Sequence, residues 1–193
     1  MSYVSQDRED YDLRLNPLNR AVVVLQRQYL DTAELRSHID RARDAIDAAN
    51  AARVCSLLSG VSGELSTCGT LLQERIGSLS PSSPPLQPAE GDSQRFWRLF
   101  RTDGPDCSGH LEALLSGYVH YARATSDSIA FLEMLGDADS VTLMQRIFDV
   151  ADRGIWFIEL YMEGLALHMD TGRLPEFTPV IDVLVPIEVN RRT

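Results

Sequence analysis

A proline-rich break in the middle of the chain limits what this sequence can fold into more than any other feature. The run LSPSSPPLQPAEGDS, residues 79–93, holds four prolines between Pro81 and Pro88. Proline has no backbone N–H to donate, and its ring clashes with the preceding helical turn, so no long helix can cross this run. Long helical patterns lie on both sides of the break. The chain is therefore expected to consist of two helical halves.

Two amphipathic segments precede the break. The first begins at Asn16-Pro17, where asparagine can cap a helix and proline suits the first helical position, and it continues to about Ile46. The run Asp31–Glu34 matches a capping box that could start another helix, but one continuous helix is the simpler interpretation. The second segment runs from about Asn50 to Ser78. Both carry apolar residues at helical spacing, namely Val22, Val23, Leu25, Tyr29, Leu30, Leu35, Ile39, Ala42 and Ile46, then Val54, Leu57, Leu58, Val61, Leu65, Leu72 and Ile76.

Two more long helices are expected after the break, from about Ser108 to Leu135 and from Asp139 to about Asp170. Asp139 or Ser140 can cap the last of these, and Gly172 is a suitable stop. The last helix has an apolar stripe that becomes aromatic on its buried face, made of Val141, Met144, Ile147, Phe148, Ala151, Ile155, Ile158 and Met162. The surroundings of Trp97 and Trp156 could bind a flat cofactor, but both residues are expected in the core, because an aromatic residue in a helical stripe is usually buried.

Two shorter segments have a different character. The run from Gln94 to Phe100 predicts one or two helical turns, whose Phe96 and Trp97 could contact a neighbouring subunit. After Arg173 the chain is rich in β-branched residues, so it predicts a strand or an extended arm. Val183 and Val185 would then either contact a partner or fold back on the same subunit.

These elements predict an all-α protein: a ferritin-like four-helix bundle with one long crossover that holds a short helix, followed by an extended C-terminal tail. The expected boundaries are an N-terminal tail over 1–15, the bundle over 16–172 and a C-terminal extension over 173–193.

The last long helix also resembles that of the Dps family, the mini-ferritins or DNA-starvation protection proteins. That helix follows a Gly-Asp-rich turn, here Gly136-Asp137, and carries a run similar to Trp156-Phe157-Ile158-Glu159. The run Leu72–Ile76 matches the family's Ala-Glu-Arg run, and the resemblance extends from about Pro17 to His168. It implies a shell of identical subunits, most often a dodecamer, and a paralogous subunit is a further candidate partner.

The resemblance implies iron as the candidate metal, bound at a ferroxidase site between two subunits, because iron prefers imidazole and carboxylate ligands. The segment from Arg43 to Ser59 falls where the family carries its His-Trp-Asn and His-x-x-x-Asp signature. The family ligand positions fall on Arg43, Cys55, Ser59, Thr70 and Glu74, and only Glu74 keeps a ligand type. Arg43 is a permanent cation that would repel Fe²⁺. Ferroxidase activity is therefore predicted to be absent or weak, and no cofactor is assigned with certainty.

Several other groups are candidate metal ligands or pore residues. Asp31, Glu34 and His38 can share one helix face, and His110 with Glu112, His120 with Tyr121, and His168 are further candidates, although exposed charge pairs are the simpler interpretation. Asp137 and Asp139 are either a helix cap with a solvated face or the mouth of a family-type acidic pore. The family's pore aspartate falls on Thr142, which speaks against cation conduction.

Charge excludes some partners. The net charge is -10, and all 18 basic residues are arginine. Because sequence-independent DNA binding needs a surface rich in basic side chains, no nucleic acid partner is expected. No segment is apolar enough to span a membrane, no signal pattern opens the chain, and a cytoplasmic location is predicted. Cys55, Cys68 and Cys107 lack metal-site spacing and are expected to be buried or half-buried free thiols.

The sequence therefore predicts a Dps-like shell protein with a structural or binding role. The alternative is an iron-storing mini-ferritin that protects against oxidative stress through an atypical metal centre, for example one that uses His38 or His120.

Overall fold

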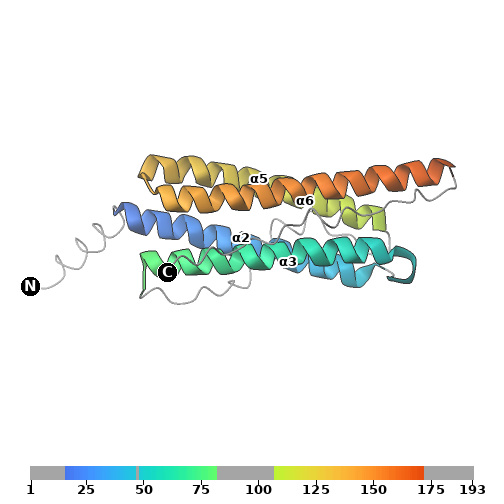
Figure 1. Ribbon diagram of the computed structural model, residues 1–193, viewed down its shortest axis with the longest axis horizontal. Coiled ribbons are helices and arrows are strands. Elements are labelled where there is room, and N and C mark those ends of the chain that lie inside the picture. The colour runs from blue at the N-terminus through green and yellow to red at the C-terminus, as the bar shows by residue number, and fades with distance from the viewer. Residues whose placement is uncertain (1–15, 47, 82–106, 172–193) are drawn as a thin grey trace, which may run out of the picture.

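The computed structural model describes residues 16–46, 48–81 and 107–171, which form four long helices (Figure 1). These are α2 (Pro17–Ala45), α3 (Ala48–Leu79), α5 (Cys107–Leu135) and α6 (Ala138–Thr171). Their bounds confirm the four predicted helices to within two residues. The expected N-terminal tail, the short helix with Phe96 and Trp97, and the tail with Val183 and Val185 lie outside the described residues. The domain boundaries therefore stay a prediction.

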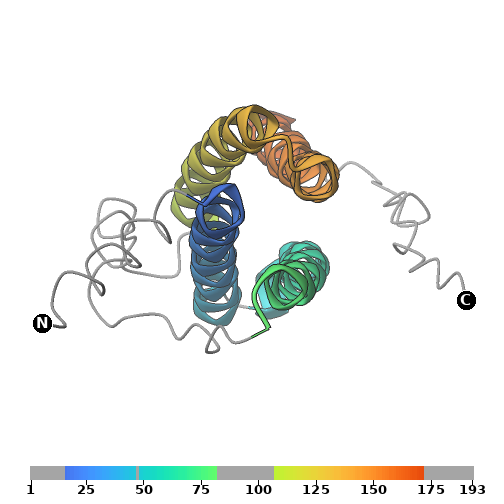
Figure 2. The ribbon, with the colours of Figure 1, turned by 90° about the vertical axis from the view of Figure 1, so that its left-hand side faces the viewer.

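The four helices form two antiparallel hairpins, α2–α3 and α5–α6, that pack against each other. Helix α2 also packs against α5, and α3 packs against α6. Viewed along the bundle, the helices surround a common axis (Figure 2). Helices α3 and α5 are parallel, so the end of α3 and the start of α5 lie at opposite ends of the bundle (Figure 1). Two hairpins related in this way by one long crossover make a ferritin-like four-helix bundle.

Helix α2 is continuous, as the simpler interpretation of its sequence predicted. Asn16 caps its start by accepting a hydrogen bond from the Leu18 N–H at 3.0 Å. The capping-box pattern at Asp31–Glu34 starts no new helix: Asp31 pairs with Arg27 at 3.1 Å, and the buried Thr32 hydroxyl donates to the Gln28 carbonyl.

The turn between α5 and α6 is set by Gly136. Its φ of 74° is a left-handed conformation that favours glycine. The Gly136 N–H donates to the Glu133 carbonyl, and the Asp137 N–H donates to the Leu132 carbonyl. These two bonds are a Schellman motif, which ends α5 and lets α6 begin two residues later.

The core lies along the bundle axis and receives large apolar side chains from all four helices. The largest fully buried ones are Leu25, Leu35, Ile39, Leu58, Leu65, Leu72, Leu111, Tyr118, Leu132, Met144, Ile147 and Ile158. Most of the predicted stripe positions are therefore confirmed. The three cysteines are free; Cys68 is buried, and Cys55 and Cys107 are half-buried, as expected.

Two predicted core residues are wrong. Val23 is 62% exposed and Trp156 is 57% exposed. Each lies next to a residue that does face the core or its edge, Val22 and Ile155, and a step of one residue turns a helix by about 100°. The Trp156 ring packs edge-on against Phe157 instead, with 5.0 Å between ring centroids. Trp97 lies outside the described residues.

Candidate functional site

The five predicted ligand positions lie on the outer side of the bundle, along α3 and at the end of α2. Ser59, Thr70 and Glu74 are exposed, while Cys55 and Arg43 are half-buried. The Ser59 hydroxyl donates to the Cys55 carbonyl at 2.8 Å, and the Thr70 hydroxyl donates to the Ser66 carbonyl at 3.2 Å. These two hydroxyl groups therefore bond their own helix, one turn back, rather than point together at a common centre.

Within one chain the five positions form two groups. The Cys55 Sγ lies 4.0 Å from the Arg43 carbonyl oxygen, and Ser59 follows one turn along α3. Thr70 and Glu74 form the second group, also one turn apart. At about 1.5 Å per residue, Ser59 and Thr70 are separated by about 16 Å along α3. One chain therefore does not bring the five positions to a single point.

Arg43 belongs to a charged network that the sequence interpretation did not identify. Its guanidinium lies 3.1 Å from both the Asp40 and the Asp44 carboxylates. Asp40 also accepts a hydrogen bond from the Ser62 hydroxyl at 3.0 Å, and Arg36 donates to Ser66 at 3.3 Å. The sequence signal that could have predicted this network is the spacing of arginine and aspartate three or four residues apart on one helix face. The network joins the outer faces of α2 and α3.

The acidic residues at the start of α6 have definite partners. Asp137, not Asp139 or Ser140, caps the helix: its carboxylate accepts bonds from the Ser140 N–H at 3.1 Å and the Ser140 hydroxyl at 2.6 Å. The cap predicted at Asp139 or Ser140 is wrong because α6 begins one residue earlier, after the Schellman turn. The interpretation of Asp137 as a helix cap is confirmed. Arg75 at the end of α3 pairs with Asp137 at 2.6 Å and with the exposed Asp139 at 3.3 Å.

Opposing effects set the pKa of Asp137. Burial is the largest single effect and raises the pKa, but the hydrogen bonds from Ser140 and Arg75, with the charge of Arg75, together lower it below its ordinary value. Asp137 is therefore an ionised cap and ion-pair partner at neutral pH.

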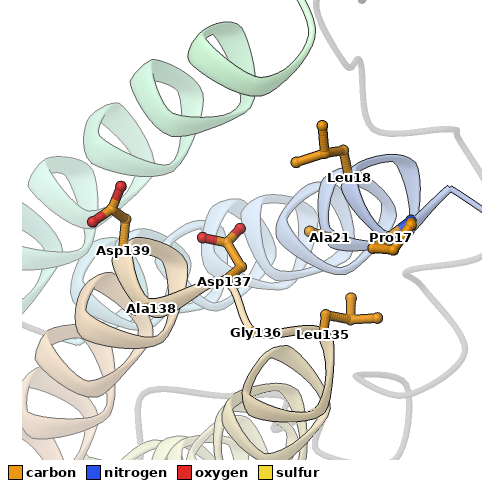
Figure 3. Close-up of a pocket in the computed structure, with 8 residues that line it drawn as sticks. All are labelled: Pro17, Leu18, Ala21, Leu135, Gly136, Asp137, Ala138 and Asp139. Atoms are coloured by element: carbon orange, nitrogen blue, oxygen red, sulfur yellow. The ribbon is translucent and has the colours of Figure 1, made fainter.

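A shallow pocket of about 360 Å³ lies beside this turn (Figure 3). Leu18, Ala21 and Leu135 form its apolar side, and Asp137 and Asp139 lie on its other side. Both carboxylates at this candidate pore mouth are paired with Arg75, and the Thr142 hydroxyl donates to the Ala138 carbonyl within α6.

The histidines of the alternative interpretation are spread over the bundle. His38 is half-buried, and its Nε2 lies 3.1 Å from the Arg41 guanidinium. Burial first, and then the Arg41 charge, lower the pKa of His38 to about 4, so its imidazole is neutral at pH 7. Burial raises the pKa of Asp31, against the lowering effects of Arg27 and His120. His110 is buried and His120 is exposed. Within residues 16–46, 48–81 and 107–171, no group of three or more His, Cys, Asp or Glu side chains could hold a metal ion.

A buried polar layer between α2 and α5 was also missed. The Gln28 amide donates to the Thr125 hydroxyl at 2.8 Å, and the Thr32 and Tyr121 hydroxyls lie 2.6 Å apart. Burial is the main effect that raises the pKa of Tyr121, so the Tyr121 hydroxyl stays protonated at neutral pH. The only sequence signal for this buried layer was a polar residue inside an apolar stripe, as at Gln28.

No described helix combines the length and the apolar composition that crossing a membrane requires.

No protein-family model matches this sequence, and no curated protein matches it. Among solved structures, the chain is similar to a mutant of Mycobacterium smegmatis Dps1, with a TM-score of 0.69 and 21% sequence identity. The match covers 76% of this chain and 97% of the Dps1 chain. At this identity the likeness establishes the fold and not the activity. The chain therefore has a Dps-like ferritin fold.

Proposed function

We propose that this protein is a Dps-like subunit that assembles with copies of itself into a shell and has a structural or binding role rather than a ferroxidase role. The observation that carries this proposal is the donor set at the predicted ligand positions. Arg43 is held by Asp40 and Asp44, Ser59 and Thr70 bond their own helix, and Glu74 is the one carboxylate. These residues do not fit iron, which needs several imidazole or carboxylate ligands.

The outer face of α3 supports the assembly part of the proposal. Over seven turns most of its exposed residues are small, namely Ala52, Ser56, Ser59, Gly63, Thr67, Thr70 and Gly77, with Glu74 and Gln73 near one end and Arg53 near the other. A Cβ atom added at Gly63 would meet nothing within 4 Å, although glycine in a helix interior costs up to about 1 kcal/mol relative to alanine. Packing within one subunit does not require this glycine. A face of small residues allows the close approach of another subunit.

The oligomeric state is the first test. Size-exclusion chromatography with light scattering should give a large multiple of the 21.5 kDa subunit mass, with twelve subunits expected for a family-type shell. Gly63→Arg should break or shrink the assembly while circular dichroism stays helical. Ser126→Arg, an equal charge change at an exposed position on α5, is the matched control. A stable monomer in the unmodified protein would refute the shell.

Iron oxidation is the second test. The purified protein is mixed with Fe²⁺ and oxygen or peroxide, and the ferric absorbance is followed. We expect a rate close to that of buffer. Rapid oxidation that Glu74→Ala abolishes would show that the family site is active.

A neutral His38 favours one alternative, since neutral imidazole is the form that binds metals. In that case the protein stores iron through an atypical centre. Metal analysis of the purified protein, with His38→Ala and His120→Ala beside the unmodified chain, distinguishes the two. Iron that is retained by the unmodified chain and lost from one of these variants would favour storage.

Nucleic acid is not among the proposed partners. Five of the described arginines, Arg27, Arg36, Arg43, Arg75 and Arg153, are paired with a carboxylate, and the net charge of the chain is -10. This negative charge opposes binding to the phosphates of nucleic acid. A gel shift at physiological salt should show free DNA.

A further inference from the structure

The Tyr118 side chain reaches the centre of the bundle with a polar atom that the surrounding helices do not satisfy. Tyr118 is fully buried, and among the described residues its hydroxyl has no hydrogen-bond partner. A buried hydroxyl without a partner costs about 1–3 kcal/mol, so such groups usually bind a buried water or another ligand.

The position of the ring is fixed by α6. A Cβ atom added at Gly154 would lie 2.5 Å from Tyr118 Cε1 and 2.9 Å from Cζ, so the ring from α5 lies directly against the glycine backbone. Beyond Gly154 lies the contact between α6 and α3, where Arg153 faces Glu64 at 3.7 Å. Tyr121, Glu64 and Cys68, in that order of effect after burial, raise the pKa of Tyr118. The Tyr118 ring lies against Gly154, and the neighbouring Arg153 pairs with Glu64 from α3.

The hydrogen bonds in the neighbouring polar layer determine which acceptor atoms remain available near Tyr118. The Thr32 hydroxyl donates to the Gln28 carbonyl at 2.7 Å, so its contact with Tyr121 uses the Tyr121 proton, and Thr32 accepts. The Tyr121 oxygen can therefore accept, and the Gln28 side chain uses one of its two lone pairs, so one lone pair remains. The carboxylate of Glu64, whose side chain is 20% exposed, is a second acceptor at the edge of the core.

The charge of the surroundings limits the ligand class. Tyr118, Tyr121 and Cys68 all have raised pKa values, to about 11 for Cys68, so all three are neutral at pH 7. Arg153 is opposite Glu64, and Arg146, the other arginine that acts on Cys68, has an exposed side chain. Leu65 and Leu72, on the same helix as Glu64 and Cys68, are fully buried, so any ligand among these side chains has to be very small.

We propose that the Tyr118 hydroxyl, with Glu64, Cys68 and Tyr121 around it, forms a buried site for one water-sized neutral molecule, and that water is its occupant. The molecule accepts the Tyr118 proton and donates to the Tyr121 oxygen and the Glu64 carboxylate. A buried water with two to four polar partners is a stable part of a fold. The site lies inside one subunit, so this proposal is independent of the shell proposed above.

A high-resolution crystal structure of the whole protein tests the site directly. We expect a single well-ordered water peak within hydrogen-bond distance of Tyr118 Oη, and its loss in Tyr118→Phe. The isosteric Phe ring keeps the packing against Gly154, so the variant should fold. Density at this place that belongs to the protein chain, or no peak beside an ordered Tyr118 ring, would overturn the proposal.

Thermal unfolding provides a second readout that does not need crystals. If the hydroxyl binds a water, Tyr118→Phe should lower Tm, because a satisfied bond network is lost. If the hydroxyl is truly unpaired, the same variant should raise Tm, which would refute the proposal. Glu64→Gln, which keeps an acceptor oxygen, should retain the water peak, whereas Glu64→Leu should lower its occupancy.

Discussion

Asp137 has two partners at the start of α6, Ser140 and Arg75. Its carboxylate caps the helix through Ser140 and pairs with Arg75 from α3. One side chain of 11% exposure therefore joins the start of the last helix to the end of the second.

Replacement of Asp137 should accordingly destabilise the fold. We expect Asp137→Ala to cost about 1–3 kcal/mol, since it removes a cap worth about 1 kcal/mol and leaves the partly buried Arg75 without its closest carboxylate. Asp137→Asn keeps the cap and should cost less. Asp139→Ala removes a carboxylate that is 83% exposed and should change stability by less than about 0.5 kcal/mol. Urea unfolding midpoints would measure all three, and equal effects at the two positions would contradict this assignment.

Gly154 is the glycine with the clearest packing reason in the described helices. Gly154→Ala places a methyl group against the Tyr118 ring, and overpacking of this kind costs about 1–3 kcal/mol. Alanine recovers at most about 1 kcal/mol through its helix propensity. At Gly77 an added Cβ meets nothing within 4 Å, so Gly77→Ala should be neutral or stabilising. Thermal unfolding of the two variants tests the contrast, and a stabilised Gly154→Ala would contradict it.

His38 makes stability depend on pH in a definite window. In the unfolded chain this imidazole takes up a proton near pH 6.5, whereas in the folded protein its pKa is about 4. The unfolded state therefore binds more protons between these values, and stability falls as pH is lowered from about 6.5 to 4. His38→Asn should flatten this part of the profile of Tm against pH. An unchanged slope would show that His38 titrates normally.

At the scale of the helices, the buried polar layer sets how α2 meets α5. Gln28 and Thr32 from α2 bond Thr125 and Tyr121 from α5, and these polar pairs are satisfied only when the two helices are in this register. Such layers can fix one arrangement among several apolar ones.

A double-mutant cycle would measure this link. Thr32→Val leaves the Tyr121 hydroxyl unpaired in the core and should cost about 1–3 kcal/mol. Adding Tyr121→Phe removes the orphan group, so the double variant should be less destabilised than the sum of the two single ones. Exact additivity in urea unfolding would mean that the two hydroxyls do not interact.

The same scale shows what could be predicted from sequence. Helix bounds were predictable because the spacing of residues such as Leu58, Leu65 and Leu72 repeats the helical period and proline excludes helix between Pro81 and Pro88. The prediction of a buried Trp156 was wrong because it followed from the aromatic residue type and not from the angle at which position 156 projects from the helix. The Asp137 cap depends on a backbone turn at Gly136, and the polar layer depends on which helices become neighbours. The second relation is not local in sequence.

The candidate site was predictable only as a set of positions. Residue types at Arg43, Cys55, Ser59, Thr70 and Glu74 could be read from the chain, but their partners could not. The spacing of Asp40 from Arg43 allows an ion pair but does not require one. The distance between Ser59 and Thr70 could be calculated only once both were known to lie on the single helix α3.

At the scale of the whole molecule, the contacts divide into those within each hairpin and those between hairpins. Most packing lies within α2–α3 and within α5–α6. The polar layer, the Arg75–Asp137 pair and the Arg153–Glu64 pair all join one hairpin to the other.

This division has a kinetic consequence. Contacts close in sequence form early because their loop-closure entropy is small, whereas docking of the two hairpins requires the long crossover to close. Docking should then follow the main folding barrier, so Thr32→Val should accelerate unfolding and leave the folding rate nearly unchanged. In a chevron plot only the unfolding arm would move. The polar links between the hairpins would thus determine how long the folded subunit lasts rather than how quickly it forms.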